Sequence, residues 1–89
     1  MLETKLSIIN KLGLHARAAG KLVNLTKSFS SDILIARDGE EVDAKSIMAV
    51  MLLAAPLGTE VQVRVSGEDE EAAMAAVCAL INDRFGEEE

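Results

Sequence analysis

The sequence predicts a single α+β domain over residues 1–89, in which a four-stranded antiparallel sheet carries three helices on one face. Segments that alternate apolar and polar residues, as strands with one buried face do, are interspersed with segments of helical periodicity. A chain of 89 residues is too short for a second domain, and its hydrophobic content of 49% is ample for one core. With Phe29 and Phe85 as the only aromatic residues, that core is expected to be aliphatic.

The first half of the chain predicts a strand, a helix and a hairpin. Alternation of apolar and polar residues predicts a strand over about residues 2–9. After Gly13 the period becomes that of an amphipathic helix, expected over about residues 16–27. Residues 32–37 and 40–44 are short β-prone segments, joined by an Asp-Gly pair that supplies the positive φ angles of a tight turn. These two strands are expected to pair antiparallel.

Capping and breaking residues define the second helix. Ser46 stands at the expected N-cap, the helix covers residues 47–53, and Pro56 discourages its continuation. Alternating valines over residues 61–65 then predict the last strand.

The C-terminal segment predicts a third helix, from Asp69 to near Gly86. Acidic residues in its first turn and Arg84 in its last turn complement the helix dipole. Its apolar stripe consists of Met74, Val77, Ile81 and Phe85. Residues 87–89 are expected to form a frayed acidic tail. The order of elements is therefore βαββαβα.

Composition excludes several classes of function. A net charge of −6 disfavours a nucleic-acid partner, and the scarcity of aromatic residues removes a stacking platform for single strands. No residues have metal-ligand spacing, and the lone Cys78, expected to be a small core residue, cannot form an internal disulfide. The longest apolar run, residues 47–57, is too short to span a bilayer. We therefore expect a cytoplasmic monomer without a metal, a cofactor or a membrane-inserted segment.

Charge is distributed unevenly along the chain. Residues 1–37 carry six basic side chains against two acidic ones, whereas residues 38–89 carry three basic side chains against thirteen acidic ones. The basic part contains His15, the only histidine. A phosphate or an acidic partner surface is therefore favoured near this residue.

His15 directly precedes the first predicted helix. The first N–H groups of a helix have no intrahelical partner and the dipole is positive there, so this position suits an anion. A phosphoryl group on a ring nitrogen could accept hydrogen bonds from those N–H groups, and Arg17 could reach the same oxygens. A lone histidine at a helix start is more often a solvated or capping residue. However, no other residue in this chain offers a nucleophile with a base beside it.

Two segments carry a resemblance to a known family. GLHARAAGKLV, residues 13–23, closely resembles the phosphorylated-histidine site of the histidine-containing phosphocarrier (HPr) family of the bacterial phosphoenolpyruvate:sugar phosphotransferase system. KSIMAVMLLA, residues 45–54, resembles the regulatory-serine site of that family. The two sites lie about thirty residues apart, as in the family, and the predicted order of elements matches its open-faced β-sandwich.

The resemblance implies a phosphocarrier that is a substrate of enzymes rather than an enzyme. His15 would accept a phosphoryl group from enzyme I through Nδ1 and pass it to a sugar-specific enzyme IIA, while Arg17 steadies that group. Ser46 would be the target of a regulatory HPr kinase/phosphorylase. One departure is Ala18, where the family commonly has Pro; because Ala is a good helix former, the helix start is expected to survive with less rigidity.

Ser46 also has a purely structural interpretation. Serine is a preferred N-cap, and capping alone would account for it. A phosphate there would sit at a helix N-terminus without unfolding the helix, while its charge would block the approach of an acidic enzyme I.

Two sets of surface residues are expected to contact partners. The second helix is apolar nearly all round, so part of it is expected to be exposed, although an unusually buried helix is an open alternative. The exposed candidates are Ile47, Met48 and Met51. The first helix carries polar residues that are most simply a solvated face and that could steer an acidic partner. They are Lys21, Asn24 and Lys27.

Three alternative functions stay open at this point. The chain could serve the nitrogen-related branch of the phosphotransferase system, with a carrier (NPr) that regulates rather than imports sugar. It could be a binding module whose Ser46-phosphorylated form docks on a transcription regulator, His15 contributing only contact. It could also be a small-ligand regulatory domain, for which the fold alone would be evidence.

Overall fold

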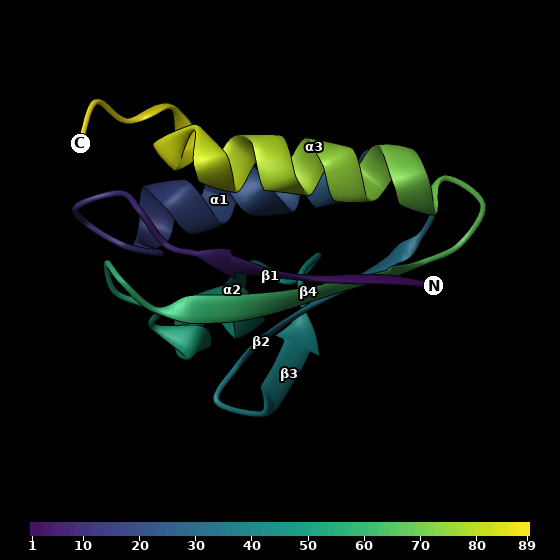
Figure 1. Ribbon diagram of the computed structural model, residues 1–89, viewed down its shortest axis with the longest axis horizontal. Helices are drawn as coiled ribbons and strands as arrows, with labels where there is room; N and C mark the ends of the chain where they lie inside the picture. Colours follow the sequence, from purple (N-terminus) through teal and green to yellow (C-terminus); the bar gives the residue numbers. More distant parts are fainter.

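The computed structural model describes all of residues 1–89 and confirms the α+β architecture. The elements are β1 (Leu2–Ser7), α1 (Ala16–Thr26), β2 (Asp32–Arg37), β3 (Glu40–Asp43), α2 (Ile47–Leu53), β4 (Glu60–Ser66) and α3 (Glu70–Asn82). The strands form one antiparallel sheet in the order β1-β4-β2-β3. Figure 1 shows α1 and α3 running side by side along the sheet, with the two chain termini at opposite ends of the molecule.

The pairing register separates a buried face of the sheet from an open one. Val63 of β4 lies opposite Thr4 of β1 and Ile35 of β2, and this row faces the helices. On the other face Arg64 lies 3.3 Å from the Glu3 carboxylate and donates to Glu41 at 2.9 Å. Because side chains alternate along a strand, the polar members of β1 and β4 share this open face, as predicted. They are Glu3, Lys5, Ser7, Gln62 and Arg64.

The core is aliphatic, as expected, and one aromatic residue completes it. It contains 20 buried residues, drawn from the inner face of the sheet and from all three helices. Phe85 is its only fully buried aromatic side chain, while Phe29 and Cys78 pack against the core from partly buried positions. All four residues of the predicted stripe are buried, but only Met74, Val77 and Ile81 lie on α3, while Phe85 lies beyond its end.

The ends of the elements show two corrections. β1 ends at Ser7 rather than near residue 9, since the next two residues no longer belong to the ladder with β4. α3 ends at Asn82, so the expectation that Arg84 occupies its last turn is wrong. Arg84 and Phe85 have φ angles of 56° and 55° within a 3₁₀ turn, Arg84–Gly86. Two consecutive left-handed residues cannot continue a right-handed helix, so the chain leaves the α3 axis here.

Candidate functional site

His15 is the N-cap residue of α1. Its backbone is extended, with φ −78° and ψ 177°, and its carbonyl accepts the first helical hydrogen bond from the Ala19 N–H at 2.8 Å. Its side chain makes no capping hydrogen bond, and the amide N–H groups of residues 16–18 have no partner within the protein. The start of α1 therefore presents free donors next to the imidazole, the arrangement that binds anions at helix ends.

The loop before His15 is fixed by close backbone contact. Gly13 has a φ angle of 68°, and a Cβ at this position would lie 2.6 Å from the Ala55 carbonyl oxygen and 2.8 Å from the Pro56 Cα. The next residue, Leu14, donates its N–H to the same Ala55 oxygen at 2.8 Å. The β1–α1 loop thus packs against the connection between α2 and β4 with no room for a side chain, and this contact fixes where α1 begins.

Gly13→Ala is expected to lower the free energy of unfolding by about 2–3 kcal/mol, because it adds backbone strain at positive φ to a steric clash with backbone atoms. Urea denaturation followed by circular dichroism measures the loss. The matched control is Gly39→Ala, since Gly39 has a φ of 83° but a Cβ added there would meet no atom within 4 Å. The control should cost only about 1 kcal/mol. Equal losses in the two variants would contradict the packing argument.

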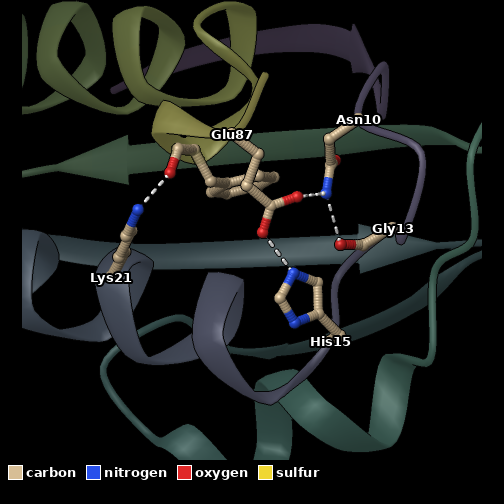
Figure 2. Close-up of polar contacts among 6 residues, drawn as sticks. Asn10, Gly13, His15, Lys21 and Glu87 are labelled. Carbon is tan, nitrogen blue, oxygen red and sulfur yellow. Dashed lines mark hydrogen bonds and ion pairs between the residues drawn. The ribbon is translucent and has the colours of Figure 1, made fainter. Parts of the chain in front are cut away.

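The C-terminal tail returns to the imidazole (Figure 2). The Glu87 carboxylate contacts His15 Nε2 through Oε2, and its Oε1 accepts a hydrogen bond from Asn10 Nδ2 at 2.9 Å. Asn10 is fully buried and also donates to the Gly13 carbonyl at 2.7 Å. The expectation that residues 87–89 fray is therefore wrong. The positive-φ turn after α3 directs the tail toward the β1–α1 loop, where it finds specific partners.

Further contacts hold the tail at both ends. Lys21 Nζ, on α1, donates to the Phe85 carbonyl at 2.6 Å. The Lys11 N–H donates to the Glu89 carbonyl oxygen at 2.9 Å, and the Lys11 ammonium lies 3.4 Å from the Glu89 carboxylate. The tail thus bridges the middle of α1 and the loop before it.

The tail changes the electrostatics expected from the sequence. An open hollow beside His15 is lined by Lys11, Leu12, His15, Ala16, Arg17, Glu87, Glu88 and Glu89. The hydrogen bond from Asn10, together with the His15 and Lys21 side chains, lowers the pKa of Glu87, so this carboxyl is ionised at neutral pH. The basic first part of the chain is therefore joined at the site by acidic residues from its far end. Nothing local in the sequence of the tail indicated this.

Arg17 lies in the first turn of α1 with its side chain exposed. It lines the same hollow as His15. Its guanidinium makes no ion pair, although three carboxylates of the tail line this hollow. Arg17 therefore remains available to a further anion.

The exposed apolar patch expected on α2 is confirmed. Ile47, Met48 and Met51 are 43%, 69% and 41% exposed. Leu52, at 78%, is more exposed than any of them and was not predicted, and neither were Leu12 and Leu57 outside the helix. Met51 and Leu12 line a second hollow that also includes His15, so the apolar surface reaches the imidazole. In a helix that is apolar all round, periodicity could not indicate which residues face outward.

Ser46 caps α2 as predicted. Its Oγ accepts from the Ala49 N–H at 3.3 Å, and its side chain is partly buried. Along α1, Lys21, Asn24 and Lys27 are all exposed, as expected for a solvated face. Only Lys21 among these three is engaged within the protein, through the Phe85 carbonyl.

Two kinds of feature are absent from the structure. No three His, Cys, Asp or Glu side chains are gathered in a way that could hold a metal ion. No helix has the length and hydropathy needed to cross a membrane.

Comparisons with known proteins all point to one family. A family model described as the PTS HPr component phosphorylation site matches residues 2–83. The chain is 54% identical over 89 residues to a phosphocarrier protein HPr of Cupriavidus necator, covering 100% of both chains. It superimposes on the crystal structure of HPr-C-His from Thermoanaerobacter tengcongensis with a TM-score of 0.96, at 44% identity and 100% coverage of both chains. An HPr dimer from the same organism gives a TM-score of 0.78 at 44% identity, over 98% of this chain and 100% of that one.

Proposed function

Because the chain belongs to the HPr family of phosphocarriers of the phosphotransferase system, we propose that His15 accepts a phosphoryl group from enzyme I and delivers it to a sugar-specific enzyme IIA. One observation carries this proposal. The imidazole stands at the start of α1 beside amide N–H groups that have no partner, with the unpaired Arg17 lining the same hollow. A phosphoryl group on the ring would meet these donors and the guanidinium.

The transfer needs little from the carrier beyond position and charge. The Nδ1 lone pair attacks phosphorus, the N–P bond forms, and the bond from phosphorus to its donor atom on enzyme I breaks. The reverse exchange delivers the group to enzyme IIA. Donors at the helix start and Arg17 would offset the negative charge of the phosphoryl oxygens. The remaining electrostatic stabilisation belongs to the partner enzymes.

The two partner enzymes are proposed to use one overlapping surface. The apolar residues Ile47, Met48 and Met51 lie on α2, and Met51 shares the second hollow with the imidazole. Flexible methionine side chains suit a surface that accepts several partners. Lys21, Asn24 and Lys27 would add charge and polarity for steering along α1. Because both enzymes must reach His15, only one of them could bind at a time.

Intact-mass analysis tests the proposal. The protein is incubated with enzyme I, phosphoenolpyruvate and magnesium, beside a His15→Ala variant. We expect one acid-labile phosphoryl group on the wild type and none on the variant. No gain by the wild type, with an enzyme I shown to charge another carrier, would contradict the proposal. Repeating the incubation with the nitrogen-branch enzyme I in place of the sugar-branch enzyme I distinguishes the two branches by their relative rates.

Ser46 is proposed as a regulatory phosphorylation site, because a phosphate at this cap would add charge next to the exposed face of α2. Ser46→Asp is expected to slow phosphoryl acceptance from enzyme I by up to roughly tenfold through charge repulsion. The free energy of unfolding should change by less than about 0.5 kcal/mol, since Asp caps helices as well as Ser. Initial rates at limiting carrier concentration measure the effect.

Ser46→Asn is the matched control, because Asn is an equally good cap without the charge. It should transfer at the wild-type rate. A rate loss as large with Asn as with Asp would mean that the hydroxyl or the shape of the cap matters, and not charge. In the corresponding binding-module hypothesis, a regulatory HPr kinase/phosphorylase phosphorylates Ser46. A transcription regulator then binds the phosphorylated form.

The oligomeric state is proposed to be monomeric. The surface around His15 has to be free for partner enzymes, which favours a monomer. The alternative is a dimer, the form in which a relative in this family crystallised. Light scattering at the concentrations used for the transfer assay separates the two states, and a dimeric mass would overturn this part of the proposal.

A further inference from the structure

We propose that Glu87 is a positioning residue for His15: its carboxylate, held by Asn10, keeps the imidazole proton on Nε2 and so leaves the Nδ1 lone pair free to attack phosphorus. This inference rests on the proposed carrier function and names a further residue for the same site. It is assigned from the hydrogen-bond network around His15.

The first step concerns the Glu87 carboxylate. An ionised carboxylate is only an acceptor of hydrogen bonds, whereas a neutral imidazole has one donor and one acceptor nitrogen. Glu87 Oε2 contacts His15 Nε2, so the shared hydrogen atom has to belong to Nε2. Nδ1 makes no hydrogen bond within the protein. The neutral ring is therefore a nucleophile at Nδ1, by the same tautomer logic that orients the histidine of a Ser-His-Asp triad.

The second step concerns Asn10, which determines what kind of hydrogen-bonding group can face it from position 87. Asn10 Nδ2 donates to the Gly13 carbonyl at 2.7 Å and to Glu87 Oε1 at 2.9 Å, and the side chain is fully buried. Turning its amide over would place Oδ1 against two acceptors, so the amide group has one orientation. Asn10 Oδ1 itself has no partner. Since Asn10 Nδ2 is a donor in a buried position, the atom of residue 87 that faces it has to be an acceptor.

The third step makes a sharp prediction for glutamine at position 87. A glutamine side chain has one acceptor oxygen and one donor NH₂ group. Because Asn10 requires an acceptor, the oxygen faces Asn10 and the NH₂ group faces His15 Nε2. A donor there needs Nε2 as acceptor, so the proton moves to Nδ1 and blocks the attacking lone pair. Glutamine should therefore be more harmful than alanine, which leaves the tautomer unconstrained. A residue that only fixes the tail would show the opposite order.

The experiment combines ring spectroscopy with transfer rates for the wild type and the variants Glu87→Gln, Glu87→Ala and Glu88→Gln. Since the chain contains a single histidine, ¹⁵N spectra of its ring at alkaline pH report one tautomeric equilibrium. Glu88→Gln removes the same charge from the same hollow, and the Glu88 side chain makes no hydrogen bond or ion pair. It controls for the general effect of negative charge on an incoming phosphoryl group.

We expect the proton on Nε2 in the wild type and in Glu88→Gln, and mainly on Nδ1 in Glu87→Gln. Phosphoryl acceptance should fall by about tenfold or more in Glu87→Gln, by analogy with the loss when the carboxylate partner that fixes the tautomer of a metal-ligating histidine is removed. The loss should be smaller in Glu87→Ala. A wild-type ring protonated on Nδ1, or Glu87→Gln transferring as fast as Glu88→Gln, would overturn the inference.

The two proposals fail in different ways. If enzyme I does not charge the wild type at all, the carrier function fails, and the ¹⁵N spectra of the uncharged protein still decide whether Glu87 sets the tautomer. If the wild type is charged but Glu87→Gln keeps the wild-type spectrum and rate, the carrier function stands and the role of Glu87 does not.

Discussion

Replacing Phe85 with Ala is expected to lower the free energy of unfolding by about 3–5 kcal/mol, the usual cost of emptying a phenylalanine site in a core. The ring is 0% exposed and is the only fully buried aromatic side chain among 20 core residues. Domains of this size are stabilised by about 5–15 kcal/mol in total, so this change is a large fraction. Urea denaturation followed by circular dichroism measures it, because the chain contains no Trp or Tyr for fluorescence.

Phe85→Leu is the control for this prediction. It keeps most of the apolar volume and should cost less than about 1.5 kcal/mol. The backbone of residue 85 accepts the hydrogen bond from Lys21, and the tail starts directly after it, so loosening Phe85 should also free Glu87 from His15. A loss below about 1 kcal/mol in Phe85→Ala would mean that the ring does not fill the core as described.

Arg17→Ala is expected to slow phosphoryl acceptance by roughly a hundredfold, the scale found when a single preorganised donor is removed from a charge-stabilising site. The hollow beside His15 carries three tail carboxylates, and Lys11 is already paired with Glu89. Arg17 is the cation of this hollow without an ion-pair partner, so its loss leaves the incoming phosphoryl oxygens facing unbalanced negative charge. Rapid-quench measurement of the transfer from charged enzyme I gives the rate.

Two controls define what Arg17 contributes. Arg17→Lys keeps the charge but loses the two parallel donors of the guanidinium, so its rate should lie between those of wild type and Arg17→Ala. Lys27→Ala removes one positive charge near the other end of the same helix and should change the rate by less than about threefold. Equal losses in Lys27→Ala and Arg17→Ala would indicate long-range steering and contradict a direct role at the phosphoryl group.

Most of the fold could be predicted because its signals are local. The Asp38-Gly39 turn, the Ser46 cap and the alternating valines of β4 each describe a few adjacent residues, and all of them appear where the sequence places them. Errors arise where the chain departs from a local rule. Arg84 and Phe85 take positive φ angles without being glycine, and the Phe85 ring is fully buried; no local pattern of residues indicates this turn.

Only the part of the candidate site that lies on α1 and α2 could be predicted from the sequence. His15 and Arg17 precede or open a helix, which sequence reasoning can recognise, and the apolar character of α2 is equally plain. Glu87 is separated from His15 by 72 residues and stands in a run of three identical acids. Its partner Asn10 is a polar residue in a loop, with no sign in the sequence that it is fully buried. Contacts of this kind follow from tertiary packing alone.

The position of the tail has a practical consequence for handling the protein. The last residue is hydrogen-bonded beside the imidazole, whereas the N-terminus lies at the opposite end of the molecule (Figure 1). An affinity tag or a fluorescent label attached after Glu89 would start within the hollow beside His15 and could displace the segment that contacts this residue. The same addition before Met1 would remove the charge of the terminal amine and so its ion pair with Glu70, which lies away from His15. Purification and immobilisation should therefore use the N-terminal end.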